Sequence, residues 1–157
     1  MAKKGKRKAA PGDVATNRSA AYRYHLSDKL ETGMVLTGTE VKSLRGGKAQ
    51  IKDGYVSLDQ GELWLHNVHI PPYENASRDN HEPERPRKLL AHRAEIDRLK
   101  TKVAQKGFTL VPTRIYFSDG RAKIEIALAR GKDAGDKRQT IKERDMRREM
   151  DRAMSER

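Results

Sequence analysis

The amino-acid sequence predicts a mainly β protein: a small closed β-barrel with about three short flanking helices and disordered basic termini. Three observations lead to this prediction. Short runs with the two-residue alternation of half-buried strands recur along the chain, separated by turn-forming residues. Hydrophobic residues make up 35% of the chain and charged residues 36%, so the core must be small. Apolar content falls away at both ends, which therefore lack a core-forming pattern.

The expected elements follow one another closely. They are a strand at 22–26, about one or two helical turns at 27–33, a strand at 34–37, a helix at 39–45, strands at 51–58 and 62–70, a loop at 71–87, a helix at 88–106, and strands at 108–117 and 121–129.

Alternation and capping residues justify the first four elements. Residues 22–26 alternate between apolar and basic side chains, which is typical of a strand. Ser27 and Gly33 then offer an N-cap and a stop for the helical turns, and a short apolar run follows as a strand. Thr39 offers the N-cap of the next helix and the glycines from Gly46 onward its stop.

Two hairpins are expected from their turns, at 59–61 and 118–120. In the first hairpin one face is expected to carry Trp64, His66, Val68 and Ile70. In the second, the inward face is expected to carry Ala122, Ile124, Ile126 and Leu128, and the outward face Lys123, Glu125 and Ala127. Both hairpins contribute strands to one barrel.

Between the hairpins the sequence predicts a loop and a helix. Residues 71–87 contain four prolines and no periodicity, which indicates a loop. The helix at 88–106 is predicted from apolar side chains at helical spacing, with Gly107 as its stop. These side chains are Leu89, Ile96, Leu99 and Val103.

The predicted barrel is of the OB-like, oligonucleotide-binding kind, and it divides the chain into three parts. Residues 1–16 are a flexible basic arm, residues 17–130 the RNA-binding barrel domain, and residues 131–157 a basic C-terminal tail. The tail lacks a core-forming pattern but has no proline or glycine after position 135, so it is expected to be disordered when free and helical on a bound RNA surface. A permanently disordered tail is the alternative.

Charge and composition limit the function classes. The net charge of +12 favours a polyanionic partner, with nucleic acid first. The chain has no cysteine, and neither a signal peptide nor an apolar run of about 20 residues is present, so a monomeric cytoplasmic protein without membrane contact is expected.

Catalytic and metal-binding readings find little support. The five histidines are scattered, and His66 and His69 would lie on opposite faces of a strand. The segment 45–48 lacks the spacing of a phosphate-binding loop. No nucleophile motif or isolated pair of carboxylates stands out. We therefore expect no enzyme, no cofactor and no metal.

The basic residues are more informative because a barrel would bring them together. They are Arg18, Arg23, Lys42, Arg45, Lys48, Lys88 and Lys123. With few aromatic residues in all, a wide stacking platform is not expected, although Tyr24 offers one ring face. Recognition of the shape and phosphates of a structured RNA is the prediction.

Several longer motifs resemble one known family. They are Asn17-Arg18, Gly33 with Leu36–Arg45, Trp64–Ile70, Pro86–Leu90, Gly120–Lys123 and Asp136–Arg144. In this order and over about residues 17–145, the chain resembles the tmRNA-binding (SsrA-binding) protein, the SmpB family.

The resemblance implies an OB-like barrel with three helices that binds the tRNA-like domain of tmRNA. It implies delivery, together with elongation factor Tu, to stalled 70S ribosomes for trans-translation, which rescues the ribosome and tags the nascent chain. The family's tmRNA-binding positions correspond to Asn17, Tyr24, Glu31, Leu90 and Lys123. A carboxylate such as that of Glu31 can accept from base or 2′-hydroxyl donors or position an arginine.

The resemblance also implies a role for the tail as a helix in the empty mRNA path and decoding centre of the ribosome. The corresponding residues are Asp136, Lys137, Arg138, Lys142 and Arg144. The family often has further lysines and then an aromatic or histidine residue where this chain has Asp133-Ala134-Gly135. The resemblance therefore carries no stacking role over to position 135.

Two alternatives remain open. A ribosomal or general RNA-chaperone barrel would bind RNA without preferring tmRNA. A nuclease or RNA-modifying enzyme would need a catalytic constellation.

Overall fold

The computed structural model describes residues 13–76, 79–105, 107–132 and 134–155. Within these residues the elements are β1 (Asp13–Thr16), α1 (Ala20–Arg23), β2 (Tyr24–Met34), α2 (Gly38–Arg45), β3 (Tyr55–Asp59), β4 (Glu62–His66), β5 (Arg87–Leu90), α3 (Arg93–Val103), β6 (Phe108–Ser118), β7 (Arg121–Gly131) and α4 (Ala134–Ser155).

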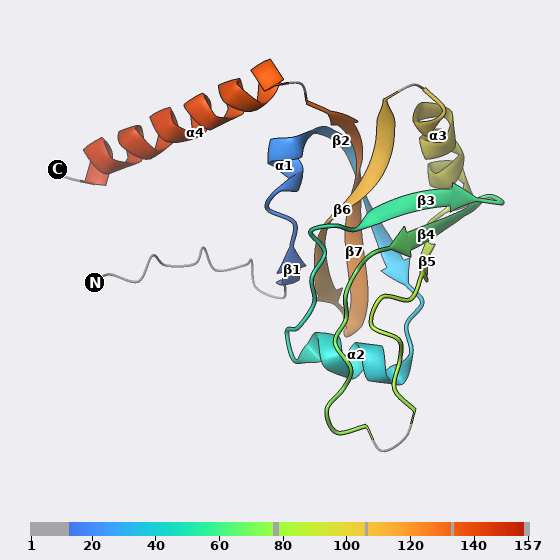
Figure 1. Cartoon of the computed structure of the whole chain (residues 1–157). Coiled ribbons are helices and arrows are strands. Elements are labelled where there is room, and N and C mark those ends of the chain that lie inside the picture. The colour runs from blue at the N-terminus through green and yellow to red at the C-terminus, as the bar shows by residue number, and fades with distance from the viewer. Residues whose placement is uncertain (1–12, 77–78, 106, 133, 156–157) are drawn as a thin grey trace.

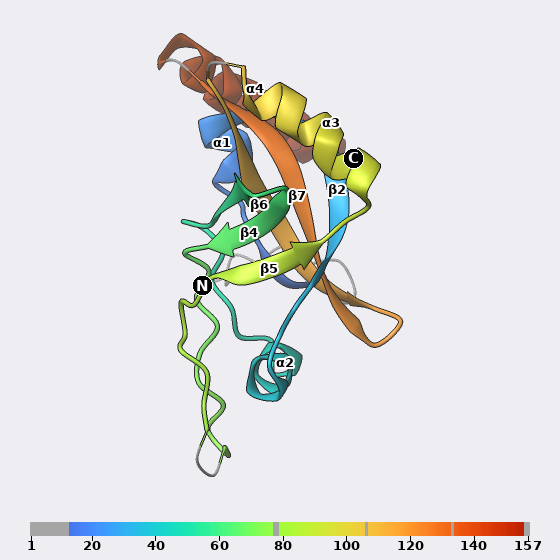
Figure 2. The same cartoon turned by 90° about the vertical axis from the view of Figure 1, so that its right-hand side faces the viewer.

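The strands form one antiparallel sheet that closes on itself. Their order is β1-β6-β3-β4-β5-β2-β7, and an additional pairing of β6 with β7 completes the ring. β1 lies outside this ring, paired only with β6 in the described residues. Closure leaves few unpaired strand edges. The predicted closed, OB-like barrel with about three flanking helices is confirmed: α1, α2 and α3 lie beside it, and α4 belongs to the C-terminal tail (Figure 1; Figure 2).

Two helices cover opposite ends of the barrel. α2 lies at the lower end in Figure 1 and places Leu44 in the core, fully buried. α3 lies at the upper end and places Ile96 and Leu99 in the same core. Each buried side chain of this size contributes about 1.5–3 kcal/mol of burial free energy. Both ends of the barrel are thereby sealed by apolar side chains.

The two hairpins form where the turns predicted them. The β6–β7 turn has Asp119 at φ 50° and Gly120 at φ 74°, and the β3–β4 turn has Gln60 at φ 50° and Gly61 at φ 77°. Two consecutive left-handed residues make the type I′ turn that matches strand twist. The predicted alternation of the second hairpin holds at Ala127 as well: it lies on the outward face opposite Val111, but it is fully buried there.

The segment before the first hairpin differs most from the prediction. Tyr22 belongs to α1, and the helical turns predicted at 27–33 are wrong because β2 runs through them. β2 pairs with β7 along most of its length, with a bulge between Ser27 and Leu30. Ladder hydrogen bonds to a partner about 100 positions away outweigh the local capping signals. β2 ends at Met34, so the strand predicted to Thr37 is too long.

α2 is shifted toward the N-terminus relative to the prediction. Its N-cap is Thr37, not Thr39, and Thr37 forms a capping box with Glu40. In this arrangement each side chain accepts a hydrogen bond from the other residue's backbone N–H.

β4 stops at His66, earlier than predicted, because Asn67 adopts φ 58° and redirects the chain. Val68 and Ile70 are consequently buried, as are Leu63 and Leu65. The prediction that Val68 and Ile70 share a face with Trp64 and His66 is therefore wrong.

The predicted helix at 88–106 is correct only in its second part. Residues 88–90 belong to β5, and α3 begins at Arg93. The predicted loop holds for residues 71–86 among those described, while Arg87 opens β5.

The described residues include part of both predicted termini. Residues 13–16, assigned to the flexible arm, form β1, and residues 1–12 lie outside the described part of the chain. The tail, expected to be disordered when free, forms the long helix α4 from 134 to 155. Figure 1 shows α4 extending away from the barrel.

Candidate nucleic-acid interface

Three of the predicted RNA-binding residues come together on the outer face of β2, β5 and β7. Gly33 of β2 pairs with Lys123 of β7 on one side and with Leu90 of β5 on the other. A side chain at Gly33 would begin 3.4 Å from the Leu90 Cβ, so glycine lets Leu90 lie across the strand. Glu31 is the next outward residue on β2, two positions before Gly33. Leu90 is 52% exposed, which is unusual for a leucine on a sheet face.

A tyrosine and an arginine from β6 border this face. The hydroxyl of Tyr116 donates to Oε2 of Glu31. The guanidinium of Arg114 lies 4.2 Å from the centre of the Tyr116 ring. Burial raises the pKa of Tyr116 well above its ordinary value, and the hydrogen bond and charge of Glu31 raise this pKa further. Tyr116 therefore remains a neutral hydrogen-bond donor.

Arg114 is fixed by two carboxylates. Its Nη1 lies 3.0 Å from Oδ1 of Asp13, and its Nε donates to Oε2 of Glu125 over 3.3 Å. Burial opposes the charge of Arg114, but the hydrogen bonds that Arg114 donates to Glu125 and Asp13 outweigh this effect and raise its pKa. Arg114 is a charged, ordered part of the face.

Lys42 and Arg45 extend the surface from α2. Arg45 Nη2 donates to the Gly120 carbonyl over 3.4 Å, and its guanidinium lies 5.2 Å from the centre of the Phe117 ring. Lys42 lies 5.5 Å from the centre of the Tyr73 ring. Because Gly120 is in the turn of the β6–β7 hairpin, Arg45 stands at the hairpin end from which Lys123 also projects, whereas Lys42 lies beside Tyr73 of the loop between β4 and β5.

Lys88 lies on the same side of β5 as Leu90, two residues before it. Its Nζ donates to Oε1 of Glu62 over 3.0 Å, and both side chains are about two-fifths exposed. Separating an exposed ion pair of this kind costs little free energy, so Lys88 remains available to a phosphate.

The predicted residues near α1 form a separate group. Tyr24 packs against the small cluster of Ala20, Val111 and Ala129. Glu31 lies seven positions after Tyr24 on β2, about 23 Å along an extended strand. The structure therefore does not bring Tyr24 together with the Glu31 face.

Asn17 and Arg18 belong to the α1 group as well. Asn17 is nearly buried: its Nδ2 donates to the Pro112 carbonyl over 3.0 Å and its Oδ1 accepts from Ser19 over 3.1 Å. These bonds hold the chain before α1 against β6. Arg18, the next residue, is exposed.

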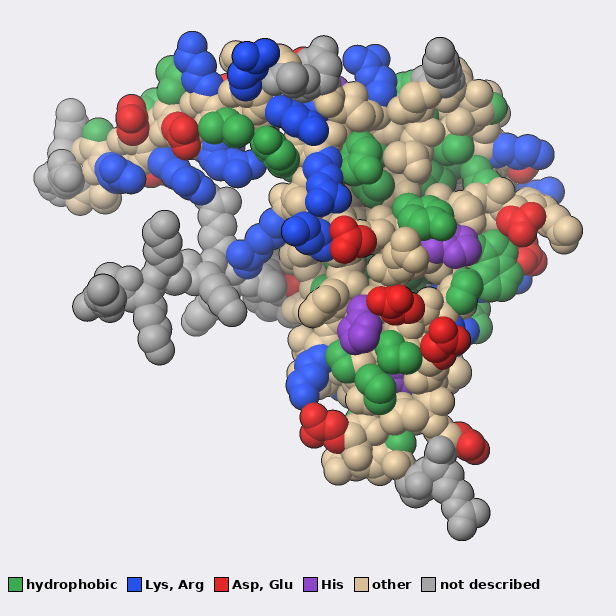
Figure 3. All heavy atoms as spheres, in the orientation of Figure 1, with side chains coloured by type: hydrophobic (Ala, Val, Ile, Leu, Met, Phe, Trp, Pro, Cys, Tyr) green, Lys and Arg blue, Asp and Glu red, His purple; other side chains and the backbone are tan. Residues whose placement is uncertain are grey.

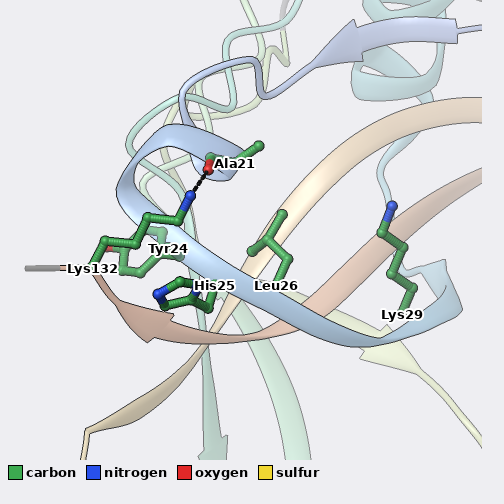
Figure 4. Close-up of a pocket in the computed structure, with 6 residues that line it drawn as sticks. All are labelled: Ala21, Tyr24, His25, Leu26, Lys29 and Lys132. Atoms are coloured by element: carbon green, nitrogen blue, oxygen red, sulfur yellow. Dashed lines mark hydrogen bonds between the residues drawn. The ribbon is translucent and has the colours of Figure 1, made fainter. Parts of the chain in front are cut away.

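A basic hollow lies between α1, β2 and the end of β7. Its lining residues are Ala21, Tyr24, His25, Leu26, Lys29 and Lys132 (Figure 4). Lys132 Nζ donates to the Ala21 carbonyl over 2.9 Å. His25 and the two lysines of this hollow were not singled out from the sequence, because only the folded chain brings position 132 next to position 21.

The first turn of α4 contacts this region, whereas the rest of the helix is exposed. Asp136 Oδ2 lies 3.1 Å from His25 Nε2, and Lys137 Nζ lies 5.9 Å from the centre of the Tyr22 ring. Arg138, Lys142 and Arg144 project from exposed positions farther along α4. Figure 3 shows Lys and Arg side chains gathered along α4 and on the face beneath it.

A buried ion cluster holds α2 against β5. Glu40 and Arg87 are both fully buried, and Arg85 also donates to Glu40. Burial opposes ionisation of Glu40, but hydrogen bonds from the Thr37 amide, Arg85 and Arg87 lower its pKa. Glu40 was not singled out from the sequence: the capping spacing of Thr37 and Glu40 could have identified it, but nothing in the sequence identifies its arginine partners 45 and 47 positions later.

Other site types find no support among the described residues. They contain no group of three or more His, Cys, Asp or Glu side chains placed to hold a metal ion. No helix within them is both long and apolar enough to cross a membrane.

Comparison with known proteins gives consistent matches over most of the chain. The family model SmpB, described as SmpB protein, matches residues 14–156. The SsrA-binding protein of Thermobifida fusca is 54% identical over 155 residues, which are 99% of this chain and 97% of that protein. The SsrA-binding protein of Acidothermus cellulolyticus is 56% identical over 144 residues, covering 92% and 91% of the two chains.

A solved structure agrees with these sequence matches. One of its chains is 46% identical with a TM-score of 0.66, covering 81% of this chain and 93% of its own length. That structure is described as "tmRNA-SmpB: a journey to the center of the bacterial ribosome".

Proposed function

The chain belongs to the SmpB family of SsrA-binding proteins, and from this membership we propose that it binds tmRNA and acts with it on ribosomes in trans-translation. The observation that carries the proposal is near full-length identity of about 55% to SsrA-binding proteins, on a chain with a net charge of +12. The proposed activity is binding and delivery and requires no catalytic step by this chain.

We further propose that the tRNA-like domain of tmRNA lies against the outer face of β2, β5 and β7. Phosphates would be contacted there by Lys123 and Lys88 on this face, by Arg45 at its hairpin end, and by Lys42 from the same helix as Arg45. Leu90, more than half exposed, would contact a ribose or base. Tyr24, Asn17 and Arg18 would form a second contact region near α1.

The tail would serve the ribosome rather than tmRNA. Lys142 and Arg144 stand on the exposed part of α4, which the barrel leaves uncovered and which could enter the mRNA path and decoding centre. Asp136, Lys137 and Arg138 lie at the start of α4, where the helix leaves the barrel. We propose elongation factor Tu as a partner during delivery, a monomeric protein, and a cytoplasmic place of action.

Removal of the tail tests this division of labour. A chain ending at residue 130 is expected to bind tmRNA within about threefold of the full-length affinity and to lose tagging of nascent chains on stalled ribosomes. The matched control is the charge variant Lys142→Gln, Arg144→Gln, which keeps the helix and should impair tagging alone. A large loss of tmRNA affinity in the truncated chain would contradict the assignment.

A competition experiment tests the partner itself. The full-length protein should prefer tmRNA to bulk tRNA and to an unrelated transcript at moderate salt, because non-specific phosphate contacts weaken steeply with salt. Equal affinity for all three RNAs would instead support a general RNA-chaperone barrel.

A further inference from the structure

Two glutamates lie side by side on the outer face and differ in their hydrogen-bond and ion-pair partners. Glu31 of β2 and Glu125 of β7 are directly opposed in the strand register. Glu125 Oε1 accepts from the Thr113 hydroxyl over 2.9 Å and has Lys29 Nζ 3.9 Å away, while Oε2 accepts from Arg114 over 3.3 Å. Both oxygens of Glu125 are thus occupied, and its charge is neutralised by two cations.

Glu31 has a different set of partners. Its Oε2 accepts from the neutral Tyr116 hydroxyl, and among the described residues it has no ion pair and its Oε1 has no hydrogen bond. The residue is exposed. Lys123 is its diagonal neighbour across β2 and β7, at a spacing of about 5–8 Å. A charged acceptor therefore stands open beside a cation.

Tyr116 is itself held in place from two sides. Only 8% of it is exposed, and Arg114 lies over its ring at 4.2 Å. Arg114 is fixed in turn by Asp13 and Glu125. The ring therefore has little freedom, and its hydroxyl keeps one direction toward Glu31.

An open carboxylate on a phosphate-binding face repels RNA unless it meets a hydrogen-bond donor. The donors that RNA offers are base amino and imino groups and the ribose 2′-hydroxyl. A glutamate that is free to rotate would lose side-chain entropy when it makes such a bond. A tyrosine that already orients it removes part of this cost.

We propose that Tyr116 is a positioning residue for RNA recognition: it holds Oε2 of Glu31 so that Oε1 accepts from a base N–H or a 2′-hydroxyl of the bound RNA. This inference rests on the proposed function, with tmRNA as the RNA. Tyr116 does not touch the RNA and acts only through Glu31. The carboxylate would also disfavour placements of the RNA that bring a phosphate to this position.

A double-mutant cycle measures the coupling. The dissociation constant for tmRNA is compared among the wild type, Tyr116→Phe, Glu31→Gln and the double variant, at several KCl concentrations. Because Glu31→Gln removes one base or 2′-hydroxyl contact and Tyr116→Phe only loosens it, we expect the first to weaken binding about tenfold and the second about threefold. The double variant should bind no more weakly than Glu31→Gln, because an amide whose oxygen is held by Tyr116 presents an NH2 donor to the RNA in place of the acceptor Oε1.

Salt dependence separates positioning from phosphate contact. All three variants should keep the wild-type slope of log affinity against log salt, since none removes a cation. Tyr73→Phe is the matched control: among the described residues its hydroxyl has no hydrogen bond, and its ring stays beneath Lys42. This control should bind like the wild type.

Ultraviolet titration of the tyrosines supplies a readout that does not depend on RNA. The wild type should contain one tyrosine that resists ionisation at alkaline pH and that is absent in Tyr116→Phe. In Glu31→Gln this tyrosine should ionise at lower pH, since a negative neighbour has gone. If this tyrosine ionised at the same pH in the wild type and in Glu31→Gln, Tyr116 would not be in contact with Glu31. That result would overturn the inference even if Tyr116→Phe folded poorly.

The failures of the two proposals can be told apart. If the wild type shows no preference for tmRNA over bulk tRNA, the proposed function fails. If the wild type prefers tmRNA but folded Tyr116→Phe binds equally well, only the role of Tyr116 fails. Additive effects of the two substitutions would also overturn that role.

Discussion

The buried ion cluster of Glu40, Arg85 and Arg87 should be the most sensitive point of the fold to a single charge change. Glu40→Gln keeps the size of the side chain and removes its charge. Arg87 would remain fully buried, with its Nη1 and Nη2 still bonded to the Val68 and Pro83 carbonyls but without a counter-charge. The glutamine amide would also present donors to arginine donors.

The structure allows the size of the effect to be bounded. Breaking a buried pair by removing one partner costs about 3–5 kcal/mol, because an uncompensated charge stays in the interior. An exposed pair is worth about 0–1 kcal/mol. Glu62→Gln breaks such a pair, since Glu62 and Lys88 are 44% and 38% exposed, and so it is the matched control.

Urea unfolding at pH 7, followed by circular dichroism, measures both variants. Glu40→Gln should lower the free energy of unfolding by about 3–5 kcal/mol with an unchanged m-value, and Glu62→Gln by no more than about 1 kcal/mol. A loss below 1 kcal/mol in Glu40→Gln would show that the cluster is not a buried, coupled unit. The substitution of Arg87 by Met in the Glu40→Gln background should recover part of the loss, since no bare cation is then left.

The same cluster predicts a pH dependence. The pKa of Glu40 is lowered in the folded state from its ordinary value of 4.5, so its stabilising contribution is complete above that value. It is lost as the pH falls through the lower, folded-state pKa. The stability gap between the wild type and Glu40→Gln should therefore be constant near neutrality and shrink below about pH 4. If the stability difference between the two proteins grew in acid, the pKa of Glu40 would have to be raised in the folded state, not lowered.

Two further substitutions give independent tests. Lys123→Ala should weaken tmRNA binding and reduce the slope of log affinity against log salt by about one phosphate contact, measured by filter binding; an unchanged slope would place Lys123 outside the interface. Gly54→Ala should destabilise the protein by about 1–3 kcal/mol in urea unfolding, because the added Cβ would lie 2.8 Å from Val68 Cγ2 and 2.9 Å from Pro112 Cγ. Gly38→Ala meets nothing within 4 Å and should be neutral or slightly stabilising; equal losses at both glycines would refute the packing argument.

The two hairpins were predicted correctly from the sequence because their turns depend only on the residues within them. Asp119-Gly120 and Gln60-Gly61 supply two residues that tolerate left-handed backbone in direct succession. The flanking alternation then defines the strands without reference to the rest of the chain. The closed barrel follows from several such strands.

Prediction failed where a distant partner decides the local structure. Residues 27–33 carry a helix cap and a stop, yet β7 pairs with this segment on both sides of the bulge between Ser27 and Leu30 and makes it a strand. Leu89 matches the helical spacing of Ile96 and Leu99, but β4 pairs with it and makes it part of β5. Neither pairing has a signal in the segment itself.

The candidate site shows the same limit. Lys123 and Leu90 could be selected from charge and motif, but their meeting across Gly33 depends on the register of three strands. Tyr116 was read only as part of a strand, because its partner Glu31 lies 85 positions earlier. Pairs of this kind become visible only when the barrel is closed.

Stability and binding measurements together can separate the buried support of the proposed interface from its contact surface. Glu40 fixes α2, with Lys42 and Arg45, to β5, so its loss should reduce tmRNA affinity only through the folded fraction and leave the salt slope intact. Loss of Lys123 should change the salt slope and leave unfolding nearly unchanged, because that residue has no ion pair among the described residues. A variant that altered both quantities would indicate that the contact surface and its buried support are coupled more closely than the strand pairing implies.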